Sequence, residues 1–215
     1  MEDYQQKFIH FAIAKKALCF GEFTLKSGRL SPYFFNSGLF NDGPGLSQLG
    51  HCYAGAIQHA GIEFDMLFGP AYKGIPLASA AAIALADHYH KAYPFCFNRK
   101  ETKDHGEGGL LFGAPLHGRV LIIDDVISAG SSVNQSIEII RAADAVPAGA
   151  VVALNRQERG AGSLSAIQEV EQIHGIHVIS IISLDNIIAY LQEDPAMRDN
   201  LEAIARYRKC YGTDS

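Results

Sequence analysis

Val120–Ser132 reads VLIIDDVISAGSS and predicts both a fold class and a site. Four apolar residues form a buried-strand pattern that leads directly into two aspartates and a loop of small residues, and a helical pattern follows. Such a loop between a strand and a helix binds phosphate, because its N–H groups and the helix dipole favour an anion. Gly130 lets the backbone approach a phosphate closely, and no lysine follows it, which excludes a Walker A loop. The hydroxyl donors are Ser128, Ser131 and Ser132.

Asp124 and Asp125 stand side by side at the end of the predicted strand. Two carboxylates there would repel a phosphate unless they face another group, such as sugar hydroxyls, a metal or a developing cation. A plainer interpretation is also open. The aspartates then cap a turn while Ser131 caps the next helix, since serine and aspartate are common in both roles.

The change from strand pattern to helix pattern recurs along the chain. Short runs that are apolar on both faces indicate strands covered on both sides, so we expect an α/β fold with a mostly parallel central sheet flanked by helices. Its length of 215 residues favours one domain, 1–215. The predicted strands are 66–68, 95–97, 120–123, 151–154 and 178–182, with a further extended segment over 23–36. The predicted helices are 3–18, 46–60, 74–90, 131–145, 164–173 and 186–207, the last interrupted at Pro195, and 41–45 is a predicted turn.

Composition excludes several classes of function. The formal net charge is −5 and no sustained basic stripe occurs, unlike in nucleic-acid-binding proteins. The N-terminus is polar and partly acidic, unlike a signal peptide, and no apolar run reaches the roughly 20 residues that span a bilayer. The four cysteines form no C-x-x-C pair, which indicates free thiols in a reducing compartment. We therefore expect a cytoplasmic protein that binds neither nucleic acid nor a membrane.

Val120–Ser132 resembles the loop that binds 5-phosphoribosyl-1-diphosphate (PRPP) in type I phosphoribosyltransferases. Three more segments, with Asn155-Arg156, resemble the orotate phosphoribosyltransferases of that family. They are KSGRLSPYFFN over 26–36, GPAYKGIP over 69–76 and RKETKDHGEGG over 99–109. Serine stands at 128 and 131 where the family usually has threonine, and it keeps the hydroxyl. The resemblance spans residues 26–156 and implies the type I phosphoribosyltransferase fold, with an N-terminal hood over the base site.

The segment 99–109 has no apolar side chain and holds three Lys or Arg, three Asp or Glu, one His and three glycines. It cannot pack a core, so it is predicted to be a mobile surface loop. One interpretation is an ordinary solvated hairpin. The other is a lid whose Arg99, Lys100, Lys103 and His105 close over a diphosphate and exclude water.

Other candidates also follow predicted strands. Lys73, after Tyr72, can contact diphosphate oxygens as a point charge. Arg156 can pair bidentately with a carboxylate, which would discriminate orotate from uracil. Phe34 and Phe35 are either core residues or a wall for a planar base.

The resemblance implies that PRPP and orotate give orotidine 5′-monophosphate and diphosphate in de novo pyrimidine (UMP) biosynthesis. It implies Mg²⁺ as cofactor, held mainly through PRPP, and a homodimer whose lids are shared between its active sites. The implied catalytic residues are Asp124, Asp125, Lys103 and Lys26. The implied PRPP contacts are Lys26, Tyr72, Lys73, Arg99, Lys100, Lys103, His105, Asp124, Asp125, Val126, Ile127, Ser128, Ala129, Gly130, Ser131 and Ser132. The implied orotate contacts are Phe34, Phe35, Ser128 and Arg156.

Two alternatives stay open on the sequence. One is a phosphoribosyltransferase for another base, which substrate trials would separate. The other is a PRPP-sensing regulator, which should carry a nucleic-acid-binding module or a degraded lid, and neither is evident here.

Overall fold

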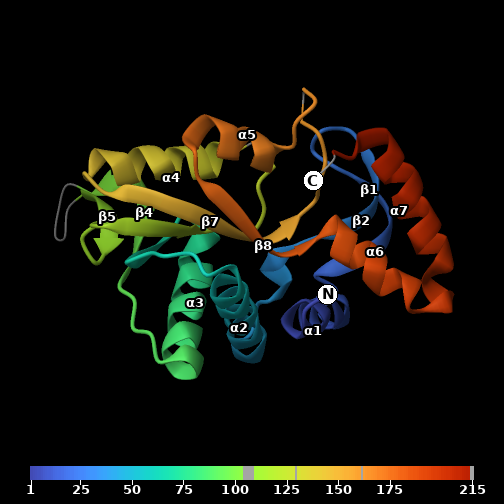
Figure 1. Cartoon of the computed structure of the whole chain (residues 1–215), viewed down its shortest axis with the longest axis horizontal. Helices are drawn as coiled ribbons and strands as arrows, with labels where there is room; N and C mark the ends of the chain where they lie inside the picture. The colour runs from blue at the N-terminus through green and yellow to red at the C-terminus, as the bar shows by residue number, and fades with distance from the viewer. Residues whose placement is uncertain (104–108, 129, 161, 214–215) are drawn as a thin grey trace.

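A six-stranded sheet in the order β5-β4-β3-β6-β7-β8 runs through the centre of the molecule, and a two-stranded hairpin of β1 and β2 lies beside it (Figure 1). The structure is a computed structural model that describes residues 1–103, 109–128, 130–160 and 162–213. Strands β3, β4, β6, β7 and β8 are parallel, and β5 pairs antiparallel with β4. The predicted α/β fold with a mostly parallel sheet is confirmed.

The elements alternate between strand and helix after the N-terminal hairpin. The strands are β1 (Leu18–Thr24), β2 (Leu30–Phe35), β3 (Met66–Gly69), β4 (Phe95–Lys103), β5 (Gly109–Gly113), β6 (Arg119–Ile123), β7 (Val146–Asn155) and β8 (His177–Ser183). The helices are α1 (Asp3–Ala14), α2 (Gly43–Ala60), α3 (Gly74–Tyr89), α4 (Ser131–Ala142), α5 (Ala166–His174), α6 (Leu184–Gln192) and α7 (Arg198–Tyr211), with short 3-10 helices η1 (Ser37–Leu39) and η2 (Pro195–Met197).

Helices cover both faces of the sheet, α2 and α3 on one side and α4 and α5 on the other (Figure 1). Successive side chains of β6 therefore enter two different cores. Leu121 and Ile123 belong to the core that includes α2 and α3, whereas Val120 and Ile122 belong to the core that includes α4 and α5. Burial on both faces explains why these strands read as continuous apolar runs rather than as alternating patterns.

Two predicted boundaries near the N-terminus were wrong. The first helix ends at Ala14, because Lys16 takes a positive φ of 57° and Leu18 already pairs with Phe35 in the hairpin. The predicted turn over 41–45 is the start of α2, where the Asp42 carboxylate accepts a hydrogen bond of 2.7 Å from the backbone N–H of Gly45. The predicted interruption at Pro195 is confirmed, since η2 separates α6 from α7.

The prediction of a loop over 99–109 was wrong at both ends. β4 continues through Arg99 to Lys103, and β5 begins at Gly109, which is opposite Lys103 in the register. Backbone pairing at the edge of a sheet needs no apolar side chain, so a wholly polar sequence can still form a strand. Residues 104–108 lie outside the described residues.

The cysteines are unpaired, as predicted from the sequence. Cys19, Cys52, Cys96 and Cys210 are all free thiols. Within the described residues, no helix is both long and apolar enough to cross a membrane.

Candidate active site

The two aspartates lie at the carboxyl end of β6, and strand pairing holds their backbone. Asp124 donates its N–H to the carbonyl oxygen of Val151 (3.0 Å), and the carbonyl oxygen of Asp125 accepts from Ala153 (2.8 Å). Both residues are buried, with 6% of their surface exposed. Because the sheet and not a flexible turn positions them, simple turn capping does not explain the pair.

The Asp125 carboxylate joins three segments that are distant in sequence. Its Oδ2 accepts hydrogen bonds from the Ser37 hydroxyl (2.8 Å) and from the Lys73 ammonium (2.5 Å). Ser37 begins η1, directly after the hairpin, and Lys73 precedes α3. Sequence reasoning selected Asp125 and Lys73 but missed Ser37, because an isolated serine carries no local signal of a partner 88 residues away.

Asp124 is held differently. Its carbonyl oxygen accepts a hydrogen bond of 2.7 Å from the buried Tyr53 hydroxyl, and its Oδ1 accepts from the backbone N–H of Asp125 at 2.9 Å. Burial and the neighbouring charge of Asp125 raise the pKa of Asp124 to about 6, although a hydrogen bond from Ser132 lowers it in part. Asp124 is therefore a carboxylate whose charge is unfavourable until hydroxyl donors arrive.

The loop after the aspartates leads into the N-terminus of α4. Gly130 has a left-handed φ of 72° and its carbonyl oxygen accepts from Asn134, so the loop turns sharply into the helix. Ser128, Ser131 and Ser132 are exposed around this N-terminus, where N–H groups and the dipole attract an anion. The side chains of Val126 and Ile127 pack against the two cores, which leaves only their backbone for a ligand. Ala129 lies outside the described residues.

The loop before α3 lies against the end of β6 because two glycines allow it. A Cβ on Gly69 would come within 2.3 Å of the carbonyl oxygen of Gly74, and one on Gly74 within 2.8 Å of that of Ile123. The peptide bond between Ala71 and Tyr72 is cis, and the N–H of Ala71 donates to the buried Asn98 side chain at 2.9 Å. The close approach that Gly69 and Gly74 allow places Lys73 beside Asp125.

The predicted lid cations fall into three groups. The Lys100 ammonium lies 4.7 Å from the ring centroid of Tyr72, a contact that joins two predicted PRPP ligands. The Arg99 guanidinium lies 5.5 Å from the ring of Phe112 on β5. The backbone of Lys103 ends β4, and His105 lies outside the described residues.

The two aromatic residues of β2 do not form one wall. Phe35 packs against Phe8 and Phe40 in the core, at centroid distances of 6.2 and 6.4 Å. Phe34 is 40% exposed and stacks on Phe23. Adjacent side chains of a strand point to opposite faces, so a base cannot contact both rings at once. Lys26 is exposed in the turn between β1 and β2.

Arg156 follows β7 and already has partners. Its guanidinium donates to Glu158 (2.9 Å from Nε) and to the Ser31 hydroxyl (3.0 Å from Nη2), and lies 4.2 Å from the ring centroid of Tyr33. The sequence predicted that Arg156 pairs with the carboxylate of orotate, but it did not identify Glu158 as a partner within the chain. The hairpin residues Ser31 and Tyr33 thus connect the N-terminal part to the end of β7.

Among the described residues, no group of three or more His, Cys, Asp or Glu side chains is arranged to hold a metal ion.

A cavity of about 480 Å³ opens next to Ser37 and Lys73, between η1 and the starts of α2 and α3. Carboxylates, one lysine, a helix N-terminus and a nearby cavity together suit an anionic ligand that carries hydroxyl groups.

Comparisons with known proteins agree with this chemistry. The model of the phosphoribosyl transferase domain family matches residues 40–182. The orotate phosphoribosyltransferase of Yersinia enterocolitica is 58% identical over 212 residues, which cover 99% of this chain and 100% of the relative. That of Thiobacillus denitrificans is 58% identical with the same coverage. The crystal structure of orotate phosphoribosyltransferase from Francisella tularensis superposes with a TM-score of 0.87 at 40% identity, covering 96% of this chain and 100% of that one.

Proposed function

Because the chain belongs to the orotate phosphoribosyltransferase family, we propose how its site carries out the reaction that this membership implies. That reaction transfers the 5-phosphoribosyl group from PRPP to orotate and gives orotidine 5′-monophosphate and diphosphate, in pyrimidine biosynthesis. The single observation that carries the assignment of roles is the buried pair Asp124 and Asp125, next to an anion-binding helix N-terminus.

The loop at the start of α4 binds a phosphate group of PRPP through its N–H groups and its serine hydroxyls. The ribose hydroxyls then donate to Asp124 and Asp125. Positive charge develops on the ribose ring as the C1–O bond to diphosphate breaks, and two nearby carboxylates stabilise that charge. Hydroxyl donors also favour the charged form of Asp124, whose raised pKa reflects burial next to Asp125.

Lys73 changes partner during this reaction. In the free protein its ammonium pairs with Asp125 at 2.5 Å, although its side chain is 58% exposed and can move. We assign Lys73, with Tyr72, Arg99, Lys100, Lys103 and His105, to the diphosphate, and Lys26 to an anion near the reacting centre. When PRPP enters, Lys73 moves to the diphosphate and frees Asp125 for the ribose.

Mg²⁺ fits this donor set as a cofactor held through substrate. Mg²⁺ is usually bound by one or two carboxylates together with substrate phosphates and waters, and the described residues offer one buried pair of adjacent carboxylates, Asp124 and Asp125. Asp124 and Asp125 would face it through the ribose hydroxyls. When bound, Mg²⁺ supplies charge neutralisation for the leaving diphosphate.

The base site lies between the hairpin and the end of β7. The hairpin acts as a hood within a single domain, with Phe34 and Phe35 lining the base through their backbone and Ser128 next to it. Arg156 pairs with the orotate carboxylate, which uracil lacks.

We further propose a cytoplasmic homodimer. Four free thiols suit a reducing compartment. β5 is an edge strand separated from β6 by the two strands β4 and β3, and Figure 1 places β4 and β5 at the opposite side of the molecule from the hairpin. A lid carried by β4 and β5 is then better placed to serve the site of a second subunit than the base site of its own.

The test is an absorbance assay for orotate consumption with PRPP and Mg²⁺, repeated with uracil, hypoxanthine and adenine. We expect turnover of orotate alone. Turnover of a different base would overturn the assignment of substrate, and PRPP binding without turnover of any base would favour a regulator.

A further inference from the structure

A polar cluster centred on Glu158 contacts Arg156. Oε1 of Glu158 accepts from Nε of Arg156 (2.9 Å), lies 2.7 Å from its Nη2 and accepts from the Tyr33 hydroxyl (3.1 Å). Oε2 accepts from the Tyr207 hydroxyl (3.1 Å). The side chains of Arg156 and Glu158 are 20% and 11% exposed, so solvent screens this pair weakly.

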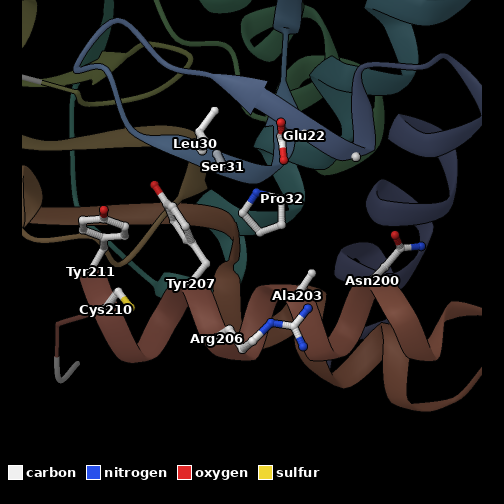
Figure 2. A pocket seen from close by; sticks show the side chains of 11 residues that line it. Glu22, Leu30, Ser31, Pro32, Asn200, Ala203, Arg206, Tyr207, Cys210 and Tyr211 are labelled. Carbon is white, nitrogen blue, oxygen red and sulfur yellow. The ribbon is translucent and has the colours of Figure 1, made fainter.

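Three separate elements hold this cluster in place. Tyr33 comes from β2 and Tyr207 from α7, and Figure 2 shows Tyr207 rising from α7 toward the strand that carries Ser31. Tyr207 and Ser31 line a cavity of about 430 Å³ between the hairpin and α7, whereas Tyr33 is fully buried behind it. The backbone of the Glu158 segment is tied to the end of α7 as well, by a bridge between Glu158 and Gly212.

The two tyrosines act as donors to the carboxylate. Burial raises the pKa of Tyr33 and of Tyr207, and the Glu158 charge raises both further, so the two hydroxyls stay protonated at neutral pH. Glu158 therefore has a donor on each oxygen in addition to the guanidinium. Its position is fixed by its own hydrogen bonds and does not depend on Arg156 alone.

Glu158 and Ser31 hold one edge of the guanidinium, and the Tyr207 side chain also hydrogen-bonds to Arg156. Nε and Nη2 of Arg156 are occupied by Glu158 and Ser31. Nη1, which carries two further N–H groups, takes no part in these contacts with Glu158 and Ser31. A planar group fixed along one edge presents its other N–H groups in one direction, which is what recognition of a carboxylate requires.

We propose that Glu158, supported by Tyr33 and Tyr207, is the positioning residue that aims Arg156 at the carboxylate of the pyrimidine. The inference rests on the role proposed above for Arg156. It makes α7, which carries no recognisable motif, part of the apparatus that selects an anionic base. A purely structural role, in which Glu158 only neutralises a buried charge, is the rival explanation.

The test compares KM for orotate, KM for PRPP and kcat in Glu158→Ala and Glu158→Gln. Alanine removes the acceptor, so KM for orotate should rise about tenfold, with KM for PRPP and kcat within about twofold of wild type. Glutamine keeps an oxygen for Nε and for Tyr33, so it should restore most of the loss. Equal losses for both substrates, or an orotate KM that Glu158→Ala leaves unchanged, would overturn the proposal.

A double-mutant cycle separates positioning from an independent effect. If Glu158 acts through Arg156, then Glu158→Ala should change KM for orotate by less than about twofold in an Arg156→Ala background. Full additivity would overturn the proposal. If Arg156→Ala itself leaves KM for orotate unchanged, the role proposed for Arg156 fails. If Arg156→Ala raises it and Glu158→Ala does not, only the positioning role fails.

Tyrosine variants keep the proposal testable if Glu158→Ala does not fold. Tyr207→Phe removes one donor to Glu158, and KM for orotate should rise about threefold with KM for PRPP unchanged. Tyr211→Phe is the matched control, since its ring lies 4.9 Å from that of Tyr207 on the same helix but its hydroxyl makes no described contact with Glu158. Equal KM values for orotate in the two variants would overturn the proposal.

Discussion

Replacing Asp124 with asparagine should stabilise the folded protein while it removes activity. The substitution keeps an oxygen for the N–H of Asp125, which now donates to Oδ1 at 2.9 Å, but it deletes a charge that burial and Asp125 make unfavourable. A carboxyl whose pKa moves from 3.8 to about 6 on folding lowers the free energy of unfolding by about 3 kcal/mol at pH values above both. A buried amide must also lose water, so we expect a net gain of about 2 kcal/mol.

The sign of the pH dependence follows from the direction of the pKa change. The folded protein binds the Asp124 proton more tightly than the unfolded chain, so wild type loses this stability as pH rises from about 4 through 6. Asp124→Asn has no such loss. The difference in Tm between the two proteins should be near zero at pH 4 and reach about 4–8 °C above pH 7, from the usual relation between free energy and Tm for a chain of this length.

The assay is thermal unfolding of both proteins from pH 4 to pH 8, with kcat measured on the same samples. Asp65→Asn is a control whose effect on Tm should have the opposite sign, because hydrogen bonds from Arg119 lower the pKa of Asp65. That control should lower Tm at neutral pH, and its effect should vanish as pH falls through the lowered pKa. A folded Asp124→Asn protein with the Tm of wild type or lower at pH 7.5 would refute the reasoning.

Four other outcomes are expected. Chelation of divalent metal should abolish turnover and Mg²⁺ should restore it, and full activity in excess chelator would contradict the cofactor proposal. Arg156→Ala should weaken the use of orotate about tenfold to a hundredfold and leave PRPP binding nearly unchanged, as loss of a charge-assisted hydrogen bond predicts. Equal losses for both substrates, measured by kinetics with each substrate varied in turn, would contradict this role of Arg156. Lys103→Ala should lower kcat with little change in Tm. If lids are shared between subunits, a randomly exchanging mixture of Lys103→Ala and Asp125→Asn chains should recover about a quarter of wild-type activity. No recovery despite demonstrated chain exchange would show that each site is built within one chain. Gly74→Ala should lower the free energy of unfolding, measured in denaturant, by about 1–3 kcal/mol, because its Cβ would lie 2.8 Å from the carbonyl oxygen of Ile123; an unchanged value would show that the loop can relax.

The buried segments of the parallel strands were predictable because they are short apolar runs covered on both faces. β6 begins one residue earlier than predicted and β8 is one residue longer at each end, whereas β4 and β7 are several residues longer than predicted. The extra residues of β4 are polar, and β5 was missed altogether. Both depend on antiparallel pairing at an edge of the sheet, which the side chains of 99–103 do not indicate by themselves.

Some predictions needed only the local sequence. Asp124 and Asp125 at a strand end, Gly130 before a helix and Lys73 after a strand could be selected because a parallel sheet brings the carboxyl ends of its strands together. In the structure the Lys73 ammonium pairs with the Asp125 carboxylate, a contact that the sequence did not predict. The lid residues His105 and Lys103 stay predictions.

The sequence by itself thus determined the strand-loop-helix units, the fold class and the loop in which anion-binding and carboxylate groups meet, because each is encoded by residues adjacent in the chain. Only the tertiary structure decided the partners of those groups. Ser37 reaches Asp125 across 88 residues and Tyr33 reaches Glu158 across 125. Hydrogen bonds at such separations depend on how the hairpin and α7 pack against the sheet, and no pattern of neighbouring residues records that packing.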